Sequence, residues 1–369
     1  MFPCRLILVF SIGLATALAQ STVTTPAVGA VNITIKKGMN VVSFPLYLAP
    51  DGERIGTTVG RVSAVTSNTI SDSSANWPTN GDFLDDGFYT TSDEYEVPVF
   101  LRFTSGTAQG RTVRILSNTA TMLTIDTADG VSSTLIDLTS STLGVATNDR
   151  YEIIRGDTLD SLFGEGTVNG TSVVNGVTVG RPLSGNADTA DVVRLYNNST
   201  GTRTTYYFCS TANTWLNADT LADASNTIIC SDTAIIYDRR AETDFRLAVA
   251  GTVPTIKRKA VVRNGSSTYL SSFWPKDVTL AQTNLHTFIG ATDVVSIFKN
   301  GSSGPWDGYR YDSVNKEWRH VGSNRPVGNI DTPAATDVKI SVGTGFIIQR
   351  SNKVLDTGSV LDQPLPYTL

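Results

Sequence analysis

The chain has 369 residues, of which 40% are hydrophobic and only 17% are charged, and its formal net charge is −5. This length allows roughly two or three domains of ordinary size. The acidic excess argues against nucleic acid and anionic membranes as partners, because both select a basic protein face. Met is scarce (3) and Gly is abundant (31) in a chain rich in Ser and Thr, which favours strands over helices.

The first residues have the pattern of an export signal. Arg5 gives a basic start, the apolar run from Leu6 to Leu14 is too short to span a bilayer, and Ala17 and Ala19 form a small-x-small cleavage pattern. We therefore expect residues 1–19 to be removed and the protein to be periplasmic, outer-surface or extracellular. A buried N-terminal helix is the alternative. No later stretch is long and apolar enough for a membrane span.

The mature chain is predicted to begin with a loose leader and two strands. Residues 20–30 contain Thr, Ala and Pro, and the next six, from Val31 to Lys36, alternate apolar and polar side chains, as a strand with one wet face does. After a turn at Gly38, a second strand runs from Asn40 to Phe44. Pro45, which cannot donate to a sheet ladder, ends it.

Residues 56–155 change in character and are predicted to form a β module of their own. Short runs rich in Val, Ile and Thr alternate with turn dipeptides such as Asn80-Gly81 and Asp129-Gly130. Regular short strands with such turns are typical of a small sandwich or barrel.

After this module the sequence predicts a short helix and a hairpin. The helix covers Thr158 to Phe163, with Asp157 as a candidate cap and Gly164 as its stop. Alternating valines around Asn169-Gly170 and Asn175-Gly176 indicate hairpin turns.

The residue pattern of the segment from Asp191 to Trp215 recurs further along the chain. One common offset relates Asp191, Val193, Tyr196 and Asn198 to Asp293, Val295, Phe298 and Asn300, and Trp215 matches Trp318 at an offset that is one residue longer. Such a fixed-spacing match indicates a repeated structural unit. We predict a first copy made of residues 20–55 and 156–250, with the 56–155 module inserted, and a second copy over residues 251–365.

Cys209 and Cys230 are the cysteines that would remain after export. An oxidising compartment favours their pairing, and both flank strand-like runs, so we predict a disulfide between neighbouring strands. Two buried free thiols are the alternative.

The repeated aromatic residues have two interpretations, sheet packing and sugar stacking. Recurrence at fixed spacing favours packing, because fold determinants must recur whereas a binding site need not. Trp77, Trp274 and Trp306 lie beside prolines in predicted loops, so they are the candidates for exposed glycan contacts, with burial as the alternative.

The chain lacks a recognisable catalytic or metal motif. Its two histidines, His286 and His320, have no second histidine at metal spacing, and no nucleophile elbow or phosphate-binding Gly loop occurs. Asp82, Asp85 and Asp86 form a weak Ca²⁺ candidate, with a solvated acidic loop as the alternative. We expect no cofactor.

The sequence resembles a family of exported bacterial proteins of unknown function. The stretches that carry this resemblance are the export signal, Gly38 to Pro45, Ser105 to Arg111, Asp149 to Ile154, Thr158 to Gly164 and Gly343 to Arg350. They are turn and core residues, so the resemblance implies a fold and brings no catalytic residues.

We therefore expect a mainly β protein, a duplicated sandwich- or barrel-like domain with a small β module inserted in its first copy. Its expected function is that of an exported, non-enzymatic surface or extracellular protein with a structural or adhesive role, through self-assembly or contact with cell-surface polysaccharide. The first alternative is a glycan-binding protein that uses exposed aromatic residues. The second is a glycan hydrolase that uses a carboxylate pair, for which Asp85 and Glu94 are candidates.

Overall fold

A computed structural model shows that the protein is mainly β, as predicted, with 46% of the residues that it describes in strands and 4% in helices. It describes residues 27–47, 58–78, 98–127, 136–141, 143–174, 176–198, 201–230, 232–300, 306–334, 336–351 and 358–367. Its sheets are antiparallel, and none of those formed by the described strands closes into a barrel. Within the same ranges, no helix has the length and apolar character needed to cross a bilayer.

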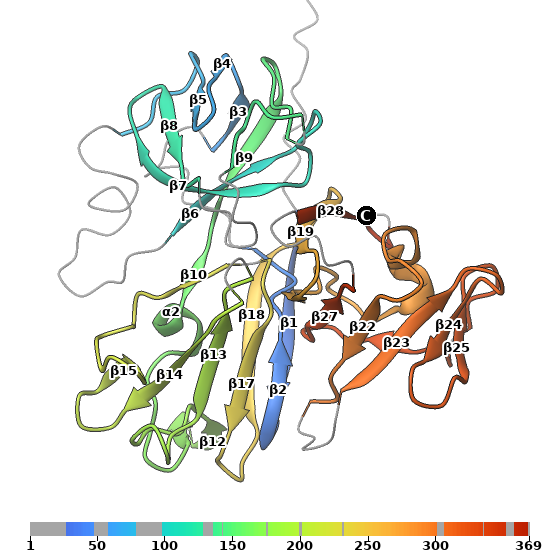
Figure 1. Ribbon diagram of the computed structural model, residues 1–369. Coiled ribbons are helices and arrows are strands. Elements are labelled where there is room, and N and C mark those ends of the chain that lie inside the picture. Colours follow the sequence, from blue (N-terminus) through green and yellow to red (C-terminus); the bar gives the residue numbers. More distant parts are fainter. Residues whose placement is uncertain are drawn as a thin grey trace, which may run out of the picture.

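The first sheet has five strands in the spatial order β15-β14-β13-β17-β2 (Figure 1). They are β2 (Gly38–Val42), β13 (Val192–Tyr196), β14 (Arg203–Cys209), β15 (Thr214–Asn217) and β17 (Ile235–Arg239). A long antiparallel pair, β1 (Val28–Ile35) with β18 (Phe245–Thr252), shares a core with this sheet. The alternation of Val31, Ile33 and Ile35 puts all three side chains into that core.

The second sheet has six strands in the order β20-β27-β22-β23-β24-β25. They are β20 (Ser267–Leu270), β22 (Val294–Ile297), β23 (Asp307–Asp312), β24 (Glu317–His320), β25 (Pro326–Asn329) and β27 (Phe346–Gln349). It packs with a second long pair, β19 (Arg258–Arg263) with β28 (Gly358–Gln363).

The strands of the two sheets follow one another in corresponding order. From the edge strand β2 the first sheet continues with β17, β13, β14 and β15, and from β20 the second continues with β27, β22, β23 and β24, so the repeated hairpin has the same place in both. Each sheet is also accompanied by a short pair, β10 (Asp157–Thr158) with β16 (Ile228–Ile229), and β21 (Val278–Thr279) with β26 (Lys339–Ile340).

Helical turns follow β10 and β21 at corresponding places. The first is α2 (Leu159–Phe163), where the side chain of Thr158, not of Asp157, caps the N-terminus, and Gly164 ends the helix at φ 64°. The second consists of η1 (Leu280–Thr283) and η2 (Leu285–Thr287). The predicted hairpin is present as β11 (Thr171–Val174) and β12 (Val177–Gly180).

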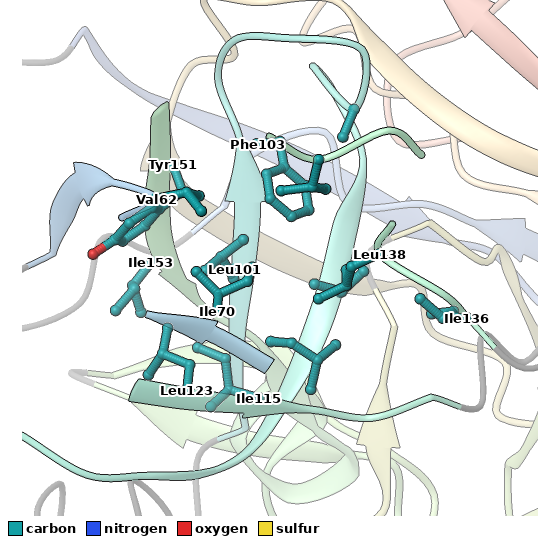
Figure 2. Close-up of a cluster of buried hydrophobic side chains, with 14 of the residues drawn as sticks. Val62, Ile70, Leu101, Phe103, Ile115, Leu123, Ile136, Leu138, Tyr151 and Ile153 are labelled. Carbon is teal, nitrogen blue, oxygen red and sulfur yellow. The ribbon is translucent and has the colours of Figure 1, made fainter. Parts of the chain in front are cut away.

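A seven-stranded sheet forms a separate module above the other two sheets (Figure 1). Its order is β3-β9-β6-β7-β8-β5-β4, with β3 (Val59–Arg61), β4 (Ala64–Val65), β5 (Thr69–Ser71), β6 (Val99–Phe103), β7 (Thr112–Asn118), β8 (Met122–Ile125) and β9 (Arg150–Arg155). Leu101, Phe103, Ile115 and Leu123 point toward one another in its core (Figure 2). Because this core is self-contained, the module has its own source of stability.

Candidate functional site

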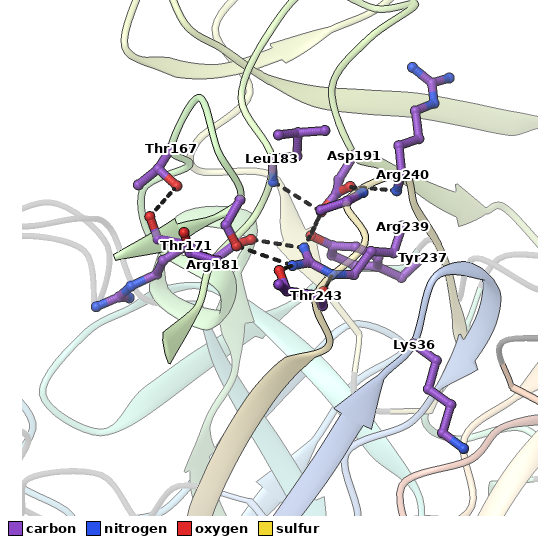
Figure 3. A network of polar contacts seen from close by, with 12 residues as sticks. Lys36, Thr167, Thr171, Arg181, Leu183, Asp191, Tyr237, Arg239, Arg240 and Thr243 are labelled. Carbon is purple, nitrogen blue, oxygen red and sulfur yellow. Dashed lines mark hydrogen bonds and ion pairs between the residues drawn. The ribbon is translucent and has the colours of Figure 1, made fainter. Parts of the chain in front are cut away.

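The repeated aspartate of the first sheet is a buried structural anchor. Asp191 Oδ2 lies 2.6 Å from Arg239 Nη1, and both side chains are fully buried. The same carboxylate accepts hydrogen bonds from the Tyr237 hydroxyl and from the main-chain N–H groups of Leu183 and Arg240 (Figure 3). Arg239 also donates to the carbonyls of Gly170, Arg181 and Thr243. Both charges are thus satisfied internally and are not available to a ligand.

The second sheet repeats this arrangement. Asp293 Oδ2 lies 3.3 Å from Arg350 Nε and accepts the N–H of Gly290, while Oδ1 accepts the N–H of Ser351. In both sheets the repeated Asp is therefore tied to an Arg at the C-terminal end of a neighbouring strand, β17 or β27.

The repeated asparagines join the two sheets to each other. Asn198, at the end of β13, accepts the Tyr269 N–H at 3.0 Å and donates to the Tyr269 carbonyl at 3.1 Å. Asn300, at the end of β22, accepts the Val41 N–H at 2.9 Å. Val41 lies opposite Ile236 in the first sheet, and Tyr269 lies opposite Ile347 in the second, so each asparagine reaches the edge strand of the other sheet.

Main-chain contacts extend this seam on both sides. The N–H of Ser43 bonds the carbonyl of Gly343 at 2.9 Å, and the N–H of Ser271 bonds the carbonyl of Asp232 at 3.0 Å. The hydroxyls of Ser43 and Ser272 lie 2.9 Å apart. The two sheets are therefore held in one fixed relation by buried polar contacts.

An aromatic cluster covers the seam. Its members, which we call the seam aromatics, are Tyr196, Tyr269, Phe298 and Trp306. The ring centroids of Tyr196 and Tyr269 lie 4.2 Å apart, and those of Phe298 and Trp306 lie 4.8 Å apart. Phe298 is buried, whereas the other three are partly exposed. This is the exposed aromatic surface nearest to the seam.

Two of the three tryptophans predicted as glycan contacts are in cores, which corrects that prediction. Trp77 and Trp274 are each 1% exposed. Trp77 packs beside Tyr151, and Trp274 stacks on Phe346 and donates its indole N–H to the Pro364 carbonyl. Neither presents a ring face to a sugar. All five tryptophans lie in the described part of the chain, and Trp306 alone among them keeps a partly exposed side chain.

The predicted disulfide is absent, because the two cysteines lie on elements that do not pair. Cys209 ends β14 with its side chain buried beside Ala190 and Tyr207, and its sulfur lies 3.2 Å from the Thr211 hydroxyl. Cys230 follows β16 and is exposed in a cleft. Both cysteines flank apolar runs, but this position along the sequence does not bring the two thiols close enough in space to pair.

This cleft, of about 340 Å³, lies where the β3–β9 module meets the two sheets. We call it the junction cleft. One wall is β7 with its preceding turn, a second is the end of the β13–β14 hairpin, and a third comes from β19 and β20. Tyr196 and Asn198 line it, so it adjoins the seam aromatics. Residues from the 227–233 segment, which include Cys230, also line it, so segments that are far apart in the sequence build the cleft and no linear motif predicts it.

The polar side of the junction cleft does not have the features of a catalytic centre. Asp126 is paired with Arg114, and Asp232 is paired with Arg258. Burial and the neighbouring Asp232 carboxylate raise the pKa of the Cys230 thiol to about 11, so this thiol stays protonated at neutral pH and is a poor nucleophile.

The remaining predicted sites are placed as follows. Asp82, Asp85, Asp86 and Glu94 lie outside the described residues. No cluster of three or more metal-ligating side chains occurs among the residues that the structure describes. His320 bonds Ser323 within its own turn, and His286 lies beside the ring of Tyr311.

Comparison of the chain with protein-family models and with curated proteins finds no match.

Proposed function

We propose that this is an exported, non-enzymatic surface or extracellular protein with a structural or adhesive role. The observation that carries this proposal is the use made of the repeated polar residues. Asp191, Asp293, Asn198 and Asn300 all make internal contacts that hold sheets together. These recurring charged and amide groups keep the sheets in a fixed arrangement. A rigid chain of this kind is suited to a load-bearing or display role.

The same proposal includes a duplicated β unit with residues 56–155 inserted in its first copy. Corresponding strand order in the two sheets supports it, as does the reciprocal bonding of Asn198 and Asn300. The likeness to exported bacterial proteins of unknown function is part of the proposal too, since Gly38 to Val42, which carry some of that likeness, form the edge strand at the seam.

Cell fractionation with N-terminal sequencing tests export. We expect a processed protein that begins at Gln20 outside the cytoplasm, and an unprocessed cytoplasmic protein would contradict the proposal. Latex beads coated with the purified protein should be retained on envelopes of the source cells more than albumin-coated beads, or the protein should assemble in light scattering. Polysaccharide turnover that is lost in Asp85→Asn or Glu94→Gln variants would favour the hydrolase instead.

Glycan binding is the second candidate, and the seam aromatics favour it. Partly exposed Tyr196, Tyr269 and Trp306 form a continuous aromatic surface, and sugar rings stack on such surfaces. A glycan array with the wild type, Trp306→Ala and, as a matched control, exposed Leu221→Ala tests it. Binding that is lost only with Trp306→Ala would support this candidate, and absence of binding by the wild type would remove it.

A further inference from the structure

We propose that the junction cleft binds a small, uncharged and mainly apolar molecule. Its volume, about 340 Å³, falls within the range of small-molecule sites, roughly 300–1,000 Å³. The inference concerns a ligand site and does not depend on the structural or adhesive role.

The apolar part of the wall comes from all three bodies that meet at the cleft. Phe100 belongs to β6 of the β3–β9 module, Ile228 belongs to β16, and Leu270 ends β20 of the second sheet. Leu195 of β13 completes this side. When an apolar ligand covers this wall, the complex is stabilised by about 25 cal/mol for each Å² of apolar surface that is removed from water.

The charges of the wall select an uncharged ligand. Arg114 faces Asp126 at 3.8 Å, and Asp232 is held by Arg258, whose guanidinium also lies over the Phe273 ring. Arg111 and Arg114 line the cleft together with Asp126 and Asp232, so the formal charges of the wall cancel and an ion of either sign meets no net opposite charge.

The cleft is held open by a tight contact between the module and β19. The Gly110 carbonyl accepts the Lys259 N–H at 3.0 Å, and the Lys259 ammonium donates to the Thr107 carbonyl at 2.6 Å. Gly110 has φ 90°, and a Cβ there would lie 2.6 Å from the Lys257 carbonyl oxygen. Only glycine fits this approach, so the module wall is fixed before a ligand arrives.

Nile red, an uncharged apolar dye with a carbonyl end, is the probe. We expect saturable one-to-one fluorescence enhancement with the full-length wild type. Cys230→Trp fills the cleft from an exposed position and should weaken binding at least tenfold, whereas Cys230→Ser preserves the volume and should bind as the wild type does. If circular dichroism shows that Cys230→Trp is unfolded, Thr204→Phe replaces it as the filling variant. Equal binding by the folded filling variant would overturn the proposal.

A second arm separates the cleft from other apolar surfaces and tests the charge preference. The β11–β12 hairpin exposes Val173 (71%) and Val177 (63%), so dye binding that disappears in Val173→Thr/Val177→Thr would place the dye on the hairpin and overturn the proposal. We expect 1-octanol to displace the dye at least tenfold more effectively than octanoate. Equal or better displacement by octanoate would overturn the preference for an uncharged ligand.

Discussion

The side-chain amide of Asn198 bonds both main-chain groups of Tyr269, a residue 71 positions further along the chain. Asn198 is 2% exposed, so these bonds are made away from water. Edge strands carry unpaired main-chain groups that invite unwanted pairing, and here an asparagine from the other sheet occupies them. Asn300 does the same at Val41. One polar residue type thus both seals two edges and sets the angle between the sheets.

Asn198→Ala should lower the free energy of unfolding by about 2 kcal/mol, because it leaves the N–H and the carbonyl of Tyr269 buried without this partner. Urea denaturation at pH 7 measures the change. The exposed Asn226→Ala variant is the matched control and should stay within about 0.5 kcal/mol of the wild type. Equal stability of the two variants would show that the seam does not depend on this amide.

Asp191→Ala should cost about 3–5 kcal/mol, because it leaves the guanidinium of Arg239 buried without its counter-ion. The double variant Asp191→Leu/Arg239→Met removes both charges and should lose less than the sum of its two single variants. A double-mutant cycle by urea denaturation checks the coupling, which we expect to exceed about 1 kcal/mol. Additive losses would mean that the two charges act independently.

Local features of the fold were readable from the sequence. The alternation at Val31, Ile33 and Ile35 predicted β1, and Asn175-Gly176 predicted the turn between β11 and β12. These signals depend only on near neighbours along the chain, through strand periodicity and turn chemistry. The capping residue of α2 was misassigned by one position, because the helix begins at Leu159 and Thr158 keeps the extended backbone of an N-cap.

Contacts between distant segments were not readable. The recurrence of the aromatic residues predicted sheet packing, but it does not determine which residues lie opposite each other. The hairpin register puts Phe208 opposite Trp215 and Tyr196 opposite Arg203. The ring of Tyr196 therefore packs on Tyr269 of the other sheet. The junction cleft could not be predicted either, because segments that are distant in the sequence line it. The one sequence signal for the seam was the recurrence of Asn198 and Asn300 at the same position of the repeat. Both lie in stretches rich in Asn, Ser and Gly, which are typical of loops, so this recurrence did not indicate a contact between sheets.

The β3–β9 module should lose stability in acid through Asp72. Asp72 is 2% exposed, and its burial tends to raise its pKa, but hydrogen bonds from Ser74, Tyr151 and the Arg61 N–H outweigh this and hold the pKa below its ordinary value of 3.8. A depressed folded-state pKa means that the stabilisation is present above pH 3.8 and is lost as the pH falls through the folded-state value.

Urea denaturation at pH 7 and pH 3 measures this linkage. Asp72→Asn should cost about 1–3 kcal/mol at pH 7 and should reduce the difference in stability between the two pH values. The exposed Asp188→Asn variant should leave that difference unchanged. An acid sensitivity that is the same in both variants would assign it to other carboxylates.

Cys230 should be a slow but accessible thiol, and Cys209 should be inaccessible in the folded protein. The side chain of Cys230 is exposed to the cleft, but the surrounding cleft walls desolvate it, and this desolvation and Asp232 raise its pKa to about 11. Less thiolate is therefore present at any given pH than for an ordinary thiol. In a Cys4→Ser protein, alkylation by iodoacetamide should therefore modify Cys230 alone, with a rate that rises about tenfold for each pH unit from 7 to 10. Mass spectrometry of the peptides identifies the modified residue.

Cys209 is 8% exposed and should react only after unfolding in urea, which serves as the control. A rate that levels off near pH 8, or a Cys209–Cys230 peptide in the non-reduced digest, would contradict both the placement of the thiols and the cleft environment of Cys230.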